Sequence, residues 1–176
     1  MNKQHPSESN ILPEILCAAS LAHHGLLGSL KVMELRNVDL TSVPAQHLAS
    51  LVSNVKYKVG ITNVSGCGLV MVLDSVKCKT LSMGRQNLDR EETQALVGAM
   101  ESAVENIMLN QEWMCWMGDD WEVTLDIDAL TKYSGQGKCR EIWWRWDRYG
   151  EQLRTWATSK NWEDASDCEN NWIKRS

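Results

Sequence analysis

Apolar residues recur two positions apart in five short segments spread along the chain. The pairs are Met33/Leu35, Val59/Ile61, Leu81/Met83, Ile107/Leu109 and Ile142/Trp144. A period of two is typical of a β-strand with one buried face. The segments begin at residues 30, 56, 78, 104 and 139, which are 26, 22, 26 and 35 residues apart. The chain is therefore predicted to repeat one structural unit.

A helical pattern follows each of the first three predicted strands. Its apolar residues have the i, i+3, i+4, i+7 spacing of one helix face: Leu48/Leu51/Val52/Val55, Leu69/Val72/Leu73/Val76 and Leu96/Ala99/Met100/Ala103. The helix follows the start of its unit by 18, 13 and 18 residues, so long and short units alternate. Asp89 and Glu92 have the spacing of a capping box, which predicts that the third helix begins there.

Segments of different character flank the repeats. Residues 1–29 are predicted to form a flexible N-terminus and a helix that caps the first unit, since the end of a repeat array must be covered. The repeats occupy residues 30–162, and residues 163–176 form a largely polar C-terminal tail.

The regular spacing of the repeated units ends after Leu109. Residues 110–122 are interpreted as an insertion, followed by a helix over 125–133 and a turn at 134–137. A last helix is predicted over Glu151–Ser159, and Asp126 and Asp128 are expected at a helix N-terminus, where negative charge is favoured.

The units resemble leucine-rich repeats, with the pattern LxxLxLxxNxL, through Leu30/Met33/Leu35 and Cys78/Leu81/Met83/Gln86/Leu88. The alternation of long and short units is similar to the ribonuclease-inhibitor-like type found in the C-terminal repeats of NLR innate-immune receptors. The resemblance implies an α/β fold, a short leucine-rich-repeat solenoid of about five strand–helix units with an N-terminal helical cap. The Asn/Cys position of the pattern holds Val38, Val64, Gln86 and Glu112. The usual ladder of buried asparagines is therefore absent, and less regular turns are expected.

The strands of such a solenoid line its concave side, and residues that flank the inward pairs face solvent. We predict a partner-binding surface at these positions: Arg36, Lys58, Thr62, Ser82, Asn106, Met108, Asn110, Trp143 and Arg145. Trp and Arg are enriched in interface hot spots. The alternative is an ordinary solvated face, because every half-buried strand has an outer side.

All nine tryptophans lie between Trp113 and Trp172, and three of them fall in the insertion. This aromatic area either packs over the C-terminal unit or binds a partner. The segment that begins at Arg140 also interleaves Arg140, Arg145, Arg148 and Arg154 with aromatic residues, a mixture that can bind nucleic acid. Acidic residues dilute that charge, which disfavours the nucleic-acid interpretation.

The composition narrows the function further. A chain of 176 residues with a net charge of −5 suits one domain and gives no general attraction to nucleic acid or to a membrane. Six cysteines lie far apart without a CxxC pair, so we predict no metal centre and a reducing, cytoplasmic location. The four histidines form no Ser-His-Asp or Cys-His arrangement, so neither catalysis nor a cofactor is predicted.

The sequence thus predicts a non-enzymatic protein-interaction module. Its resemblance implies a sensing or scaffolding fragment of an NLR-like immune protein, with a protein as partner and no membrane contact. One alternative is a substrate adaptor of a ubiquitin ligase, since LPEIL at residues 12–16 resembles the opening of an F-box. The other is a nucleic-acid-binding module that uses the Trp/Arg-rich C-terminal repeat. The pattern does not define an oligomeric state.

Overall fold

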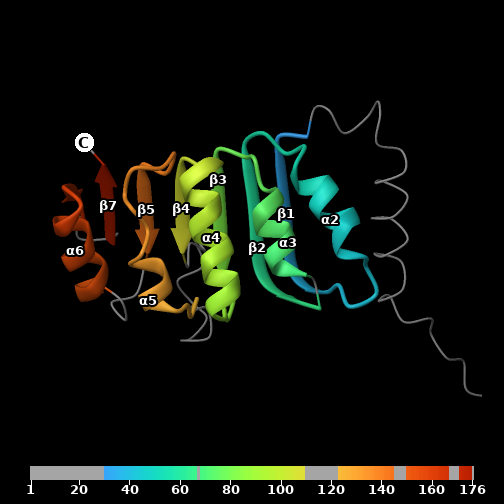
Figure 1. Cartoon of the computed structure of the whole chain (residues 1–176). Helices are drawn as coiled ribbons and strands as arrows, with labels where there is room; N and C mark the ends of the chain where they lie inside the picture. Colours follow the sequence, from blue (N-terminus) through green and yellow to red (C-terminus); the bar gives the residue numbers. More distant parts are fainter. Residues whose placement is uncertain (1–29, 67, 110–122, 145–149, 167–170, 176) are drawn as a thin grey trace, which may run out of the picture.

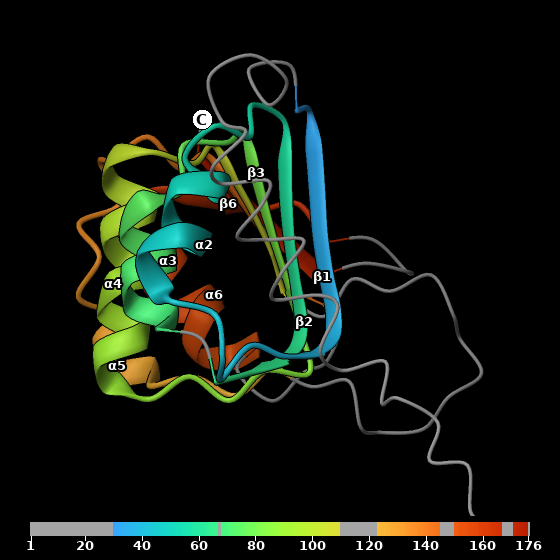
Figure 2. The same ribbon diagram turned by 90° about the vertical axis from the view of Figure 1, so that its right-hand side faces the viewer.

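The computed structural model describes residues 30–66, 68–109, 123–144, 150–166 and 171–175. In this part of the chain, seven strands form one sheet in the order β1-β2-β3-β4-β5-β7-β6. The helices alternate with the strands along the chain and cover one face of the sheet (Figure 1 and Figure 2). The protein is therefore a mixed α/β structure of alternating strand–helix units.

The elements have the following bounds. The strands are β1 (Val32–Asp39), β2 (Lys58–Ser65), β3 (Thr80–Gly84), β4 (Asn106–Leu109), β5 (Glu141–Trp144), β6 (Trp162–Asp164) and β7 (Asn171–Arg175). The helices are α2 (Ala45–Val52), α3 (Leu69–Ser75), α4 (Arg90–Ser102), α5 (Ile127–Leu130) and α6 (Gly150–Ser159).

Strands β1 to β5 are parallel, and each pairs with the next in the register that the repeat predicts. The inward residues form two continuous rows, Met33–Val59–Leu81–Ile107–Ile142 and Leu35–Ile61–Met83–Leu109–Trp144. All of these side chains are buried except that of Met33, which is half-buried. The predicted strand pairs are thus confirmed, with one side chain of each pair in each row.

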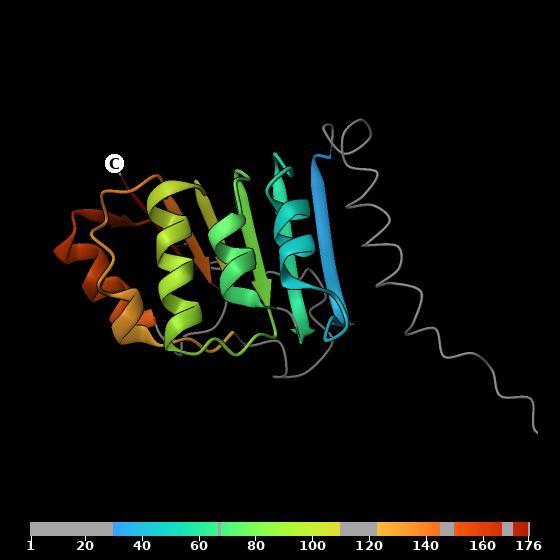
Figure 3. The same ribbon diagram turned by 45° about the vertical axis from the view of Figure 1, so that its right-hand side comes forward.

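The helices close the core from one side. The three predicted apolar quartets are buried, apart from the half-buried Ala103, and α2, α3 and α4 pack side by side along the sheet (Figure 3). A parallel pair of strands requires a crossover, and a helix that returns over the sheet buries its apolar stripe at the same time. The last predicted helix also forms, with Leu153, Trp156 and Ala157 buried.

Asp89 and Asp126 are confirmed at helix N-termini, but α5 spans only Ile127–Leu130 of the helix predicted over 125–133. The Asp89 side chain accepts a hydrogen bond from the Glu92 backbone N–H at 2.8 Å, and the Glu92 carboxylate accepts one from the Asp89 N–H at 3.0 Å. This is a capping box, which satisfies two backbone donors at the start of α4. Asp126 caps α5 by accepting a hydrogen bond from the Ala129 N–H at 3.0 Å.

The carboxyl ends of the strands share one conformation. Asn37, Asn63 and Arg85 occupy the same position in successive units, and all three have a left-handed backbone, with φ of 51°, 49° and 45°. The Asn63 side chain donates to the Asn37 side chain at 2.8 Å. One residue further on, the Gln86 amide donates to the Val64 carbonyl at 2.8 Å and accepts from the Val64 N–H at 3.1 Å. An amide thus joins two units near the place where a leucine-rich repeat carries its asparagine.

The C-terminal tail is part of the sheet. Strand β7 runs antiparallel between β5 and β6, with Ile173 fully buried opposite Ile142. Behind it, Tyr133, Trp156 and Trp162 form a buried aromatic cluster with ring centroids 5.3 to 6.3 Å apart. The Gly135 carbonyl, in the predicted turn, accepts hydrogen bonds from the Trp162 indole at 3.2 Å and from the Arg175 guanidinium at 3.3 Å.

Several sequence predictions fall outside the described residues. They include the N-terminal capping helix and the insertion at 110–122 with Trp113, Trp116 and Trp121. The chain re-enters the described part at Val123, where Thr124 pairs with the segment that follows β3. Val123 and Leu125 are buried there, so the return from the insertion is fixed to the core.

Candidate functional site

The candidate site is the face of the sheet opposite the helices, which we call the open face. Its residues alternate with the buried ones along each strand, and the common register aligns them in rows across the sheet. The first row runs Val32–Lys58–Thr80–Asn106–Glu141–Lys174, and the second runs Glu34–Gly60–Ser82–Met108–Trp143–Trp172. A third, shorter row is Arg36–Thr62–Gly84.

The structure therefore brings together seven of the nine residues predicted for partner binding. Arg36, Lys58, Thr62, Ser82, Asn106, Met108 and Trp143 all lie on the open face. Asn110 and Arg145, which continue the pattern past β4 and β5, lie outside the described residues.

An ion cluster forms the β1 end of the open face. The Glu34 carboxylate lies 3.0 Å from the Lys58 ammonium and 3.0 Å from the Arg36 guanidinium. The hydrogen bond from Lys58, together with the positive charge of both partners, lowers the pKa of Glu34 below its usual value. The three side chains remain about one third to one half exposed, so the pairs stabilise the fold by at most about 1 kcal/mol. They remain accessible to a partner.

Small residues make up the centre of the open face. A Cβ on Gly60 would lie 3.2 Å from the Glu34 Cγ, and a Cβ on Gly84 would lie 3.3 Å from the Thr62 Oγ1. Glu34 and Thr62 therefore lean over the neighbouring strand into the space that the glycines leave. Thr62 and Ser82 are only 9% and 8% exposed. The expectation that they face solvent is wrong, because alternation sets the face of a residue while the size of its neighbours sets its exposure.

A tryptophan pair forms the opposite end of the open face. Trp143 on β5 and Trp172 on β7 are cross-strand neighbours whose rings stack with centroids 4.4 Å apart and planes within 6°. The Trp143 indole N–H donates to the Glu141 carboxylate at 3.2 Å. Both rings are half-buried, and Met108 is the neighbour of Trp143 in the second row. This end combines a large apolar area with polar groups at its margin, as interface hot spots do.

Sequence reasoning missed the β7 contribution to this surface. The Lys174 ammonium lies 5.7 Å from the centroid of the Trp172 ring and 3.6 Å from the Glu163 carboxylate. The alternation of Trp172, Ile173 and Lys174 is the signal that could have indicated a strand with one buried face.

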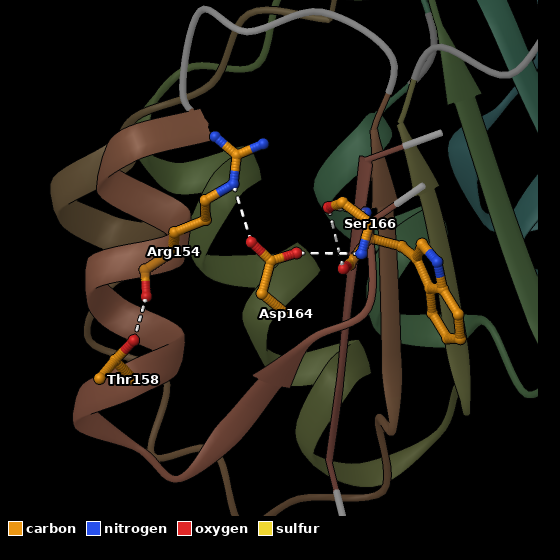
Figure 4. A network of polar contacts seen from close by, with 5 residues as sticks. Arg154, Thr158, Asp164 and Ser166 are labelled. Carbon is orange, nitrogen blue, oxygen red and sulfur yellow. Dashed lines mark hydrogen bonds and ion pairs between the residues drawn. The ribbon is translucent and has the colours of Figure 1, made fainter. Parts of the chain in front are cut away.

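Of the arginines considered for nucleic-acid binding, Arg140 and Arg154 lie in the described part of the chain, and Arg154 is not on the open face. Arg154 extends from α6, where its guanidinium pairs with the Asp164 carboxylate at 3.1 Å and lies over the buried Trp144 ring at 5.8 Å. Asp164 also accepts from the Ser166 N–H at 3.0 Å, and the Ser166 hydroxyl bonds to the backbone of Trp172, so the network ties α6 to the β6–β7 connection (Figure 4). Hydrogen bonds from Ser166 and the Arg154 charge lower the pKa of Asp164. Arg145 and Arg148 lie outside the described residues.

The two described cysteines are structural. Cys78 and Cys139 occupy equivalent positions in their units, are fully buried, and each directs its Sγ toward the carbonyl two residues later. Burial raises the pKa of both thiols, to about 12 for Cys139. A thiol with a raised pKa is a poor nucleophile.

Among the described residues, no three His, Cys, Asp or Glu side chains are grouped so that they could hold a metal ion. Nor does that part of the chain contain a helix with the length and apolar character needed to cross a bilayer.

Comparison with known proteins finds no match for this chain. No protein-family model, no curated protein and no solved structure matches this chain. The residues of the open face are therefore the starting point for a functional proposal.

Proposed function

We propose that this protein is a non-enzymatic protein-interaction module of the leucine-rich-repeat type, and that its open face binds a protein partner. The observation that carries the proposal is the register of β1 to β5, which aligns polar and aromatic side chains in rows on the face opposite the described helices (Figure 2). Repeat arrays of this kind offer an extended surface to partners. The alternation of 26- and 22-residue units supports a relation to NLR-type immune receptors.

The two ends of the open face favour a protein over a nucleic acid as its partner. Trp143 already stacks on Trp172, and the Glu141 and Glu163 carboxylates lie beside this pair. Carboxylates next to the aromatic rings repel phosphate groups. A protein surface can instead place apolar side chains against the rings and a carboxylate near Arg36 or Lys58.

The test is capture of partners from cytosolic extract by the wild-type protein and by W143A, followed by mass spectrometry. A central hot-spot tryptophan contributes about 2 kcal/mol or more to binding, so W143A should lose specific partners by more than tenfold. M71A is the matched control, because Met71 is 46% exposed on α3, in the opposite layer.

Thermal unfolding separates loss of binding from loss of folding, since W143A also removes the stack with Trp172. R36E is a second variant that alters the open face at an exposed position without touching the aromatic pair. Partners retained by both W143A and R36E, and lost by M71A, would overturn the proposal.

A further inference from the structure

A second candidate surface lies at the amino ends of the parallel strands. Basic residues lie within the three positions before four of these five strands: Lys31, Lys56, Lys77, Lys79, Lys138 and Arg140. Because β1 to β5 are parallel and in register, their amino ends meet at one edge of the sheet. We call these six residues, with Tyr57, the basic edge.

Backbone hydrogen bonds fix the order of these residues along the edge. The Tyr57 N–H donates to the Lys31 carbonyl at 2.9 Å, and the Lys79 N–H donates to the Lys56 carbonyl at 3.0 Å. Glu105, which precedes β4, donates its N–H to the Lys79 carbonyl at 2.9 Å and accepts from the Arg140 N–H at 2.7 Å. The cations therefore follow one another across the strands rather than scattering over the surface.

The basic edge is exposed and largely unneutralised. All six cations are exposed, and Tyr57 is 60% exposed. Of these six cations, only Lys79 forms an ion pair with a described residue, the Glu105 carboxylate at 3.9 Å. Further carboxylates near this edge, among the described residues, are those of Asp74 and Glu101 in the last turns of α3 and α4 and of Glu141 at the start of β5. The edge is thus positive in a chain whose net charge is −5.

The C-termini of the helices explain part of the positive charge at the basic edge. Helices α2, α3 and α4 end at the same edge, and cations are favoured near helix C-termini. That effect stabilises single lysines by a few tenths of a kcal/mol at exposed sites, and it gives no reason for an exposed tyrosine among them. Tyrosine beside cations is a combination found where a surface contacts a partner.

We infer that the basic edge binds an extended acidic segment of a partner protein. Neighbouring strands lie about 4.8 Å apart, so the edge spans roughly 19 Å from β1 to β5, the length of about six extended residues. Carboxylates on such a segment would face the lysines, and an apolar side chain would cover Tyr57.

A polynucleotide fits the basic edge less well than a peptide does. Glu105 stands in the row between Lys79 and Arg140, where a uniform line of phosphates would meet its carboxylate. A peptide can place a neutral or basic residue opposite Glu105.

The test is fluorescence anisotropy with a labelled peptide of alternating glutamate and leucine, using the full chain. The wild type should bind it, and K56E/K77E should bind about tenfold more weakly or worse, because like charges now face each other. R90E/K132E makes the same change in charge at exposed positions away from the basic edge and should bind like the wild type. K56Q/K77Q, which removes charge without adding repulsion, should fall between them.

Three results would overturn the inference. One is no binding of the acidic peptide by the wild type, and another is equal weakening by R90E/K132E. The third is tighter binding of an oligothymidylate of equal charge than of the peptide. Partners captured through Trp143 should be retained by K56E/K77E, so failure of this inference is distinguishable from failure of the open-face proposal.

Discussion

At the scale of single residues, the Gln86 side chain takes the place of a peptide group. Its amide donates and accepts hydrogen bonds with the backbone of one residue, Val64, on the neighbouring unit. In a parallel pair of strands, the N–H and C=O of one residue bond to two different residues of the neighbouring strand, whereas here one side chain supplies both partners. The side chain thus extends the pairing between units past the end of β3, where Arg85 turns the backbone out of the strand conformation.

Tyr133 presents a different case, a buried hydroxyl. Its side chain is fully buried in the C-terminal aromatic cluster, and its hydroxyl has no hydrogen-bond partner among the described residues. Burial, reinforced by the neighbouring Cys139 thiol, raises the pKa of Tyr133 to about 12. The folded protein therefore holds this phenol neutral in a range where an unfolded chain ionises it.

We predict that Y133F changes the response of the protein to alkaline pH. Between the ordinary tyrosine pKa of 10 and the folded value of about 12, the unfolded state binds fewer protons, so stability falls as pH rises. Y133F removes this contribution, and its unfolding free energy should decline less above pH 10. Near neutral pH it should change little, because no hydrogen bond is lost. Urea unfolding below and above pH 10 measures both effects.

The control for this prediction is Y57F, at an exposed tyrosine. Its stability should follow the wild-type profile at every pH. Parallel profiles for Y133F and the wild type would show that the Tyr133 phenol ionises equally easily in both states.

At the scale of elements, β7 ends the parallel array by running the other way. It pairs with β5 on one side and β6 on the other, and its only fully buried described side chain is Ile173. The edge of β5 is thereby covered, which removes an unpaired strand from the surface. The same strand supplies Trp172 and Lys174 to the open face.

We predict that I173A destabilises the fold by about 2–5 kcal/mol, the usual cost of truncating a fully buried Ile. K174A, which changes the next residue on the outer side of β7, should cost much less because that side chain is 42% exposed. Urea unfolding of the two variants gives the comparison. Similar small losses for both would mean that β7 unfolds separately from the rest of the sheet.

The sequence predicts the repeated elements well and the closing element poorly. Strands β1 to β5 follow from one pattern, because Val59, Leu81 and Ile107 each lie three positions after the start of their unit and align in the parallel register. Strand β7 shares no offset with the repeat, and its place depends on an antiparallel pairing that periodicity does not encode. The exposure of Thr62 and Ser82 likewise depends on neighbours from other strands.

At the scale of the whole molecule, the main contacts of each described unit are with its neighbours in the array. The order β1-β2-β3-β4-β5 follows the chain, and α2, α3, α4 and α5 pack in the same succession. Stability in such an array is approximately the sum of the units and their interfaces, so its ends open more easily than its centre. The basic edge has the same origin, since only the common register gathers cations that lie far apart in the sequence.

We predict that amide hydrogen exchange is slowest in β3 and β4, which have a unit on each side, and faster in β1 and β6 at the two ends of the sheet. Hydrogen-exchange mass spectrometry on the intact protein measures this gradient. The denatured protein under the same labelling conditions provides the reference for full exchange. Equal protection of all strands would indicate a single cooperative unit.

The position of β7 between β5 and β6 also affects the order in which the strands can pair during translation. Strands β2 to β5 each pair with the strand synthesised just before, so the array can grow as the polypeptide emerges, N-terminal units first. Strand β6 breaks this sequence, because its neighbour in the sheet is β7, which is translated later. During translation, the Trp162 segment therefore has no strand to pair with until β7 has been synthesised and has inserted between β5 and β6.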